Sequence, residues 1–194
     1  MSSPYAGVKP ADWLRVTEQL VAAHPLSGDQ IVAAVVDAWS SIFENSRIGN
    51  LRIGTDFFPQ AQSLGIFLHE LIPLEIAKHA PGWRRGAGKN EKDAVYESDR
   101  HFDFEIKTSS STAKIFANRS YAQPAEGGKE RAGYYLAVNF QSWDKAGDET
   151  PQLKLIRFGY LEHSDWIAQT SQRGQQARLT PEADLGKFVV LVRR

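Results

Sequence analysis

The chain of 194 residues contains no cysteine, one methionine and no net charge at neutral pH. Without cysteine it can form no disulfide bond and can bind no metal through thiolates. No apolar run approaches the length that a membrane-spanning helix needs. The opening residues, Met1 to Pro4, lack the basic start and apolar centre of a signal peptide. These absences favour a folded cytoplasmic protein.

A net charge of zero is not typical of a protein that binds nucleic acid. The charges are unevenly distributed, however. Acidic residues outnumber basic ones in residues 1–77, whereas basic residues outnumber acidic ones in 78–119 and from 152 onward. The neutral total is therefore compatible with a basic surface in the central and C-terminal parts of the chain.

Apolar residues recur at helical spacing near the start of the chain. The spacing predicts one helix over residues 11–23 and a second over 31–43. Ser27 and Gln30 have the spacing of a capping box, which would begin the second helix. The two glycines in residues 45–55 favour a loop or short hairpin there.

A third helical pattern covers residues 64–71, and Pro73 is expected to kink the helix or divide it in two. His69 and His79 have the separation of the first and third ligands in the longer zinc-protease motif. The position of the middle ligand is Pro73, so the ligand count fails and a zinc site is rejected.

The centre of the chain predicts a β-hairpin. Apolar and charged residues alternate over 102–107, which indicates a strand with one buried and one solvent-exposed face. Residues 93–97 can form the partner strand, with the turn-favouring residues 98–100 between them. A three-residue loop or a bulge places Asp93 opposite Glu105, whereas a two-residue loop would send Asp93 to the other face. We predict the first register.

In that register the two carboxylates lie roughly 5 Å apart at Cβ, and Lys107 lies about 7 Å along the same face. Adjacent carboxylates repel unless a proton or a divalent cation lies between them, and oxygen ligands suit Mg²⁺. A lysine beside such a metal can hold or polarise an attacking water. The alternative is a solvated hairpin face whose charges pair across the strands.

Residues 81–90 form a glycine-rich basic segment just before the hairpin. It lacks the full patterns of nucleotide-binding loops, so neither ATP nor NAD is predicted. Arg84, Arg85 and Lys89 are well placed to contact backbone phosphates. A plain solvated loop explains the segment equally well.

Two polar clusters later in the chain are further candidates for nucleic-acid contacts. Asn118, Arg119 and Ser120, with Lys114 just before them, carry donors suited to phosphates or base edges. Glutamine pairs with adenine, and arginine with guanine, in a major groove. The second cluster consists of Gln172, Arg173, Gln175 and Gln176. A polar surface without this role explains the second cluster about equally well.

The remaining apolar segments predict a mixed sheet. Residues 133–140 and 152–160 are expected to be core strands, and 187–193 a last strand. A short helix is expected from the Ser164-Asp165 cap through residue 172. Together with the hairpin, these strands place the charged central residues on an α/β scaffold.

Asp93, followed after eleven residues by Glu105-Ile106-Lys107, resembles the PD-(D/E)xK nuclease signature, with Lys92 where that signature usually has proline. A wider set of segments is similar to the type II restriction endonucleases of the ScaI family, over roughly residues 60 to 180. These segments are Glu91-Lys92-Asp93, Glu105 to Ser110, Asn118-Arg119-Ser120-Tyr121, Gly133-Tyr134-Tyr135-Leu136 and Ile156-Arg157-Phe158-Gly159.

The resemblance implies one α/β domain over residues 1–194 with a restriction-endonuclease-like core, in which helices flank a mixed β-sheet. Residues 1–60 would be mostly helical, and 61–194 would hold the catalytic core and the DNA-binding part. The implied activity is Mg²⁺-dependent hydrolysis of double-stranded DNA at a specific site by a bacterial enzyme, leaving a 5′ phosphate and a 3′ hydroxyl. The implied target is a short palindrome such as AGTACT, cut at its centre to blunt ends. Symmetric cutting of a palindrome implies a homodimer.

By the same resemblance, Asp93, Glu105 and the Ile106 carbonyl would hold the metal, and Lys107 would position the water. Glu70 is preferred over Glu75 as an additional acidic residue on a helix beside the hairpin. Two alternatives stay open from the sequence. One is a DNA repair or recombination nuclease with the same core, and the other is a non-catalytic DNA-binding module.

Overall fold

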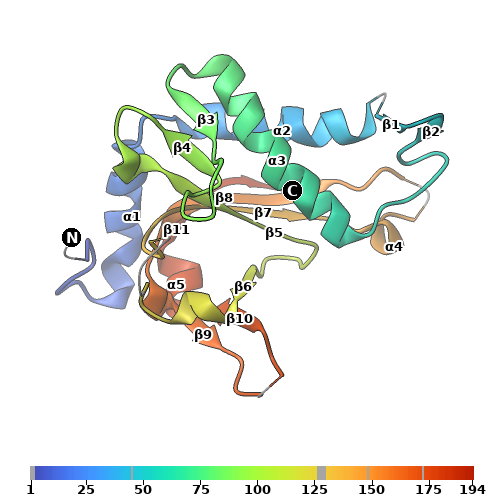
Figure 1. Ribbon diagram of the computed structural model, residues 1–194. Coiled ribbons are helices and arrows are strands. Elements are labelled where there is room, and N and C mark those ends of the chain that lie inside the picture. Colours follow the sequence, from blue (N-terminus) through green and yellow to red (C-terminus); the bar gives the residue numbers. More distant parts are fainter. Residues whose placement is uncertain (1–2, 45, 126–129, 148, 172) are drawn as a thin grey trace.

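The computed structural model describes residues 3–44, 46–125, 130–147, 149–171 and 173–194 (Figure 1). Its centre is a six-stranded sheet with the strand order β11-β8-β7-β5-β4-β3. β5 and β7 run parallel and the other neighbours antiparallel, so the predicted mixed sheet is confirmed. The strands are β3 (Trp83–Arg85), β4 (Ala94–Tyr96), β5 (Phe104–Ser109), β7 (Gly133–Phe140), β8 (Leu153–Leu161) and β11 (Phe188–Arg193).

The helices predicted for the first part of the chain are present. They are α1 (Trp13–Ala22), α2 (Gly28–Phe43) and α3 (Ala61–His79), and two shorter helices follow as α4 (Trp143–Ala146) and α5 (Pro181–Gly186). The capping box of Ser27 and Gln30 begins α2 as expected. β1 (Arg47–Ile48) and β2 (Leu51–Arg52) form the short hairpin. No described helix has the length and apolar character required to span a membrane.

The main hydrophobic core lies between the central sheet and the pair α2 and α3, which run side by side above the strands in Figure 1. Pro73 lies inside α3 and does not divide it. Proline removes one backbone hydrogen bond from a helix. The neighbouring residues Leu68, Ile72 and Ile76 are buried against the sheet, and this packing keeps α3 in one piece.

A second, smaller sheet lies below the central sheet in Figure 1 and has the order β6-β10-β9. Its strands are β6 (Phe116–Asn118), β9 (Trp166–Ala168) and β10 (Gln176–Leu179). The helix expected over residues 164–172 is therefore wrong. A 3₁₀ turn, His163–Asp165, is followed directly by β9, because buried Trp166 and exposed Ile167 alternate along an edge that pairs with β10. Position 172 lies outside the described residues.

The small sheet explains why the charged face of the hairpin is not exposed. Glu105 is 1% exposed and Asp103 is 4% exposed, so the expectation of a solvent-exposed face is wrong. The Asp103 carboxylate accepts from the backbone N–H of Tyr96 and from Arg100, whereas Glu105 is the residue that the small-sheet side covers. A second apolar cluster, built around Tyr121, Tyr135 and Trp166, covers this side of the sheet. The alternation itself is confirmed, because Phe104 and Ile106 face the main core.

Candidate active site and DNA interface

The register of β4 and β5 brings the candidate catalytic residues together. Ala94 pairs with Phe104 in an antiparallel ladder, which makes residues 93 and 105 the next opposed positions. The predicted register is therefore confirmed. The connection is longer than the three residues expected, because β5 begins only at Phe104 and the 3₁₀ turn Arg100–Phe102 precedes it.

The Asp93 carboxylate has polar contacts with two elements. Its Oδ2 atom accepts a hydrogen bond of 2.7 Å from the backbone N–H of Ile106. The same oxygen lies 3.4 Å from Nδ1 of His69 on α3. Burial would raise the pKa of Asp93, but the contacts with His69, the charge of Lys107 and the Ile106 amide outweigh burial and lower that pKa to about 2. Asp93 is therefore ionised at neutral pH.

Glu105 and Lys107 lie on the same side of β5 and share a third partner. Lys107 Nζ is 3.5 Å from Oε2 of Glu105 and 3.0 Å from the hydroxyl of Tyr121. The Tyr121 hydroxyl in turn donates to Glu105 Oε2 at 3.1 Å. Burial would lower the pKa of Lys107, but the oxygens of Tyr121, Glu105 and Asp93 outweigh it and raise that pKa. The lysine is held as an ammonium group.

These groups match the chemistry of a hard divalent cation. The carboxylates of Asp93 and Glu105 and the backbone carbonyl of Ile106 are all oxygen donors on neighbouring strands. Oxygen donors of this kind suit Mg²⁺, whereas zinc sites in proteins rely mainly on thiolate and imidazole ligands. The donor set therefore fits the metal that the resemblance implies.

The residue of α3 that contacts Asp93 is His69, the neighbour of the residue that the sequence favoured. The Glu70 carboxylate points instead to Arg85, with a 2.6 Å ion pair, and its side chain is half exposed. A role for Glu70 in the site stays a prediction. No local sequence pattern connects His69 to Asp93, so sequence reasoning assigned His69 no role beyond the rejected zinc motif.

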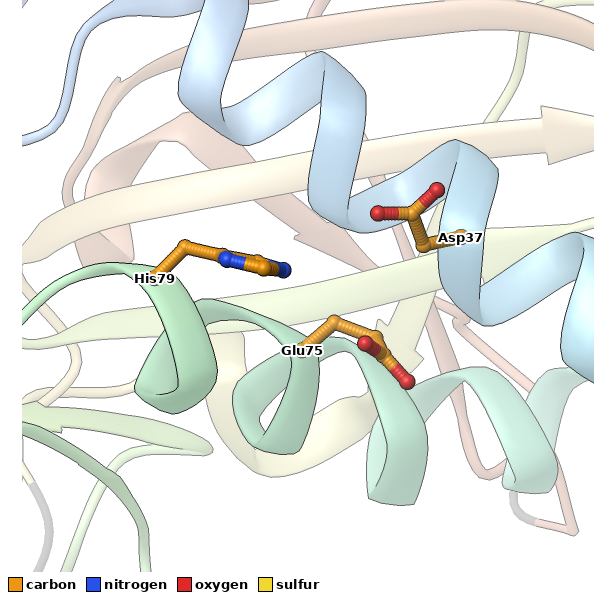
Figure 2. Close-up of side chains that lie close together, drawn as sticks. All are labelled: Asp37, Glu75 and His79. Carbon is orange, nitrogen blue, oxygen red and sulfur yellow. The ribbon is translucent and has the colours of Figure 1, made fainter.

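Glu75, the other acidic candidate on α3, lies in a different group (Figure 2). Its ligand atoms and those of Asp37 and His79 all lie within 4.8 Å of one another, between α2 and α3. The Lys78 ammonium lies 2.7 Å from Oε1 and 2.8 Å from Oε2 of Glu75 and already balances its charge. This group contains neither Asp93 nor Glu105, so Glu75 does not contribute to their site.

The basic segment before the hairpin forms strand β3 rather than only a loop. Arg84 is paired with Glu91 at 2.7 Å and with Glu97 at 3.3 Å, and Arg85 is paired with Glu70. Lys89 is exposed in the turn that follows. That turn and Arg85 border a hollow whose other wall includes His69 and Asp93. A phosphate held at this turn would lie beside the carboxylate site.

The two polar clusters predicted separately are brought together by the small sheet. Asn118 at the end of β6 pairs with Gln176 at the start of β10, and the backbone N–H of Arg119 donates to the carbonyl of Gln175 at 2.7 Å. Arg173, Gln175, Gln176, Asn118 and Lys114 are exposed, and Arg119 and Ser120 are half-buried. The candidate Gln172 lies outside the described residues. Asn118, Arg119, Gln175 and Gln176 form one polar edge, whereas Lys114 precedes β6 and lies beyond its other end.

A groove leads from this polar edge to His69, the residue of α3 that contacts Asp93. Its walls include His69 and Gly65 of α3, Thr108 and Ser109 at the end of β5, the serines 110–111 that follow, and Gln176 of β10. Gly65 allows the close approach, because a Cβ atom there would lie 2.6 Å from the Thr108 hydroxyl. The groove is therefore built by the tight packing of α3 on β5.

Comparison with known proteins gives consistent matches. Residues 3–192 match the model of the ScaI restriction endonuclease family. The chain is also 48% identical over 180 residues to the Type II restriction enzyme ScaI of Streptomyces caespitosus, a match that covers 91% of this chain and 79% of that protein. The family match includes α3, the hairpin and the small sheet, which together form the site described above.

Proposed function

Because the chain belongs to the ScaI restriction endonuclease family and is a type II site-specific deoxyribonuclease, we propose that it cuts DNA at the Asp93, Glu105 and Lys107 site with Mg²⁺. The observation that carries this proposal is the convergence of these three side chains on one side of β4 and β5. The spacing matches the PD-(D/E)xK signature, in which each of the three has a catalytic role.

In the proposed reaction a water oxygen attacks phosphorus in line with the 3′ oxygen. The attacking water gives up one proton, the bond from phosphorus to the 3′ oxygen breaks, and that oxygen takes up one proton, which leaves a 3′ hydroxyl and a 5′ phosphate. Asp93, Glu105 and the Ile106 carbonyl would hold Mg²⁺. When bound, Mg²⁺ supplies Lewis acidity, which polarises a phosphate oxygen and lowers the pKa of water.

The protein groups divide this work between them. Asp93 is ionised at neutral pH, so it offers its charge to a cation without first losing a proton. The Lys107 ammonium carries the positive charge that stabilises negative charge developing on the phosphate. Because Lys107 is 12% exposed in its side chain, little solvent screens this charge. Lys107 would also orient the attacking water.

We further propose that DNA lies along the groove between α3 and the small sheet. Arg84, Arg85 and Lys89 would contact backbone phosphates beside the hollow on the other side of His69 from the groove. The polar edge at the end of the groove away from His69 would read bases, through side chains such as Asn118 and Gln176. By analogy with the family, the target would be a short palindrome such as AGTACT cut to blunt ends, and the active species a homodimer.

Three alanine variants test the site, namely Asp93→Ala, Glu105→Ala and Lys107→Ala. Each should lose plasmid cleavage in Mg²⁺, while DNA binding measured in Ca²⁺ is retained. Glu182→Ala removes an exposed carboxylate on α5 and serves as the control. Normal cleavage by any one of the three would remove its assigned role. Sequencing the ends of plasmids cut by the wild type would give the target and show whether the ends are blunt.

A further inference from the structure

The hydroxyl of Tyr121 lies between the two charged groups of β5. It donates to Glu105 Oε2 at 3.1 Å and accepts from Lys107 Nζ at 3.0 Å. The direct distance from Lys107 Nζ to Glu105 Oε2 is longer, at 3.5 Å. The Tyr121 hydroxyl therefore lies closer to each of the two charged groups than they lie to each other.

The ring of Tyr121 is held by several neighbours. Lys107 Nζ lies 4.3 Å from the ring centroid, and the guanidinium carbon of Arg131 lies 4.6 Å from it. The ring also meets Trp166, the first residue of β9, with the centroids 5.8 Å apart. Cations over an aromatic face and tilted ring pairs are both stabilising contacts. The side chain is 9% exposed, so its position is fixed by packing.

The backbone of Tyr121 is attached directly to the small sheet. It lies in the 3₁₀ turn Arg119–Ala122, which directly follows β6, and the first residue of that turn donates its N–H to the carbonyl of Gln175. Arg119, part of the polar edge that would meet DNA, is therefore only two residues before Tyr121, whose side chain is hydrogen-bonded to Glu105 and Lys107. A shift of the small sheet on DNA would move the hydroxyl with it.

We propose that Tyr121 is a positioning residue that couples the docking of the small sheet on DNA to the geometry of Glu105 and Lys107. The inference rests on the proposed function of the Asp93, Glu105 and Lys107 site. With the sheet docked on its target, the hydroxyl orients the Glu105 carboxylate and the Lys107 ammonium for reaction. With the sheet on a mismatched sequence, the hydroxyl is displaced and the pair is misaligned. Discrimination between sequences thus includes the cleavage step as well as binding.

Tyr121→Phe tests this inference because it removes the hydroxyl and keeps the ring that packs on Trp166. The cleavage rate should be measured in single turnover with saturating enzyme and Mg²⁺, and the Kd in Ca²⁺, both on the duplex identified by end sequencing. We expect the rate to fall about 10-fold to 100-fold, as for other residues that orient metal-binding groups, and the Kd to stay within about twofold. A residue that only supported the fold would not separate the two measurements.

Tyr134→Phe is the matched control. Tyr134 lies in β7 and is 1% exposed. It belongs to the main core, on the side of the sheet opposite to Tyr121, and its hydroxyl donates to the Leu20 carbonyl. It should keep the wild-type cleavage rate, even where its melting temperature falls. An equal rate for Tyr121→Phe and wild type would overturn the inference. So would a loss of DNA binding that accounts for the whole loss of activity.

A duplex with one mismatched base pair tests the coupling itself. If docking of the small sheet sets the position of the Tyr121 hydroxyl, the ratio of the cleavage rate on the cognate duplex to that on the mismatched duplex should be smaller in Tyr121→Phe than in the wild type. An unchanged ratio would overturn the coupling. Failure of the proposed function is a separate result, because it would appear as cleavage by Asp93→Ala, Glu105→Ala or Lys107→Ala. Loss of cleavage in those variants together with a normal Tyr121→Phe enzyme would overturn the inference alone.

Discussion

The Asp93 carboxylate should stabilise the metal-free protein rather than strain it. Two carboxylates on neighbouring strands would repel if nothing else were near, and removal of one would then raise the free energy of unfolding. Here His69 and Lys107 lie close enough to outweigh that repulsion, and they lower the pKa of Asp93 from 3.8 to about 2. We therefore expect Asp93→Asn to lower the free energy of unfolding in the absence of metal.

The pKa shift gives the size of the effect. A shift of one pKa unit corresponds to about 1.4 kcal/mol, so the lowering of the Asp93 pKa from 3.8 to about 2 is worth at most about 2.5 kcal/mol near pH 5. The Asp93 side chain is 24% exposed, which allows only modest screening by solvent. The folded-state pKa lies below the unfolded-state value. The contribution is therefore fully present above pH 4 and is lost as the pH falls toward 2.

Urea unfolding followed by tryptophan fluorescence, with EDTA present, measures this difference. The difference in the free energy of unfolding between wild type and Asp93→Asn should be fully developed near pH 5 and should narrow by about half near pH 3, as the linkage relation requires. Glu18→Gln, which neutralises an exposed carboxylate on α1, should show no such difference. An Asp93→Asn protein that equals or exceeds wild-type stability at pH 5 would refute the reasoning. Repulsion from Glu105 would then dominate over His69 and Lys107.

Three further predictions concern DNA and assembly. Lys89→Ala should weaken binding to all sequences alike and reduce the slope of log affinity against log salt by about one unit, which titrations at several salt concentrations would measure. Loss of the exposed side chains proposed to read bases should reduce the difference in binding free energy between cognate and scrambled duplexes by roughly 1–3 kcal/mol per lost bidentate pair. An unchanged difference would place base reading elsewhere. The variant for this test is Arg173→Ala, Gln175→Ala and Gln176→Ala combined. Sedimentation in Ca²⁺ should show two chains on one palindromic duplex, whereas one chain that cuts both strands at once would contradict the dimer.

The register of the hairpin could be predicted because side chains along a strand alternate between its two faces. Alternation over 102–107 fixes which residues share a face, and a slip of one position would turn the apolar residues away from the core. The observed pairing of Ala94 with Phe104 follows from that requirement, even though the connecting turn differs from the one expected. The start of α2 was predictable for a similar reason, since both hydrogen bonds of its capping box are local.

The burial of the charged face could not be predicted in the same way. Alternation identifies which side chains share a face of β5 and contains no information about what covers it. The cover comes from Tyr121 and Trp166, which the small sheet and the turn after β6 bring to this face, where both rings meet near Tyr135, the neighbour of Glu105 on β7. The segment from 166 to 168 is also too short for its periodicity to distinguish a strand from a helix. The helix predicted over residues 164–172 and the predicted exposure of Glu105 were therefore wrong for the same reason, because both depend on the small sheet, whose strands pair over long distances in the chain.

The same limit separates the three proposed catalytic residues from the residues that contact them. Asp93, Glu105 and Lys107 lie on two adjoining strands, so their spacing in the chain carries the geometry of the site. His69 reaches Asp93 from α3, and Tyr121 reaches Glu105 from the small sheet. No spacing rule connects either of them to its partner. Residues that hold a metal are thus visible as a motif when one hairpin carries them, whereas residues that orient those ligands become visible only as contacts. Tests of specificity in this enzyme should accordingly include Tyr121, whose hydroxyl links the sheet proposed to meet DNA to the proposed catalytic pair, Glu105 and Lys107.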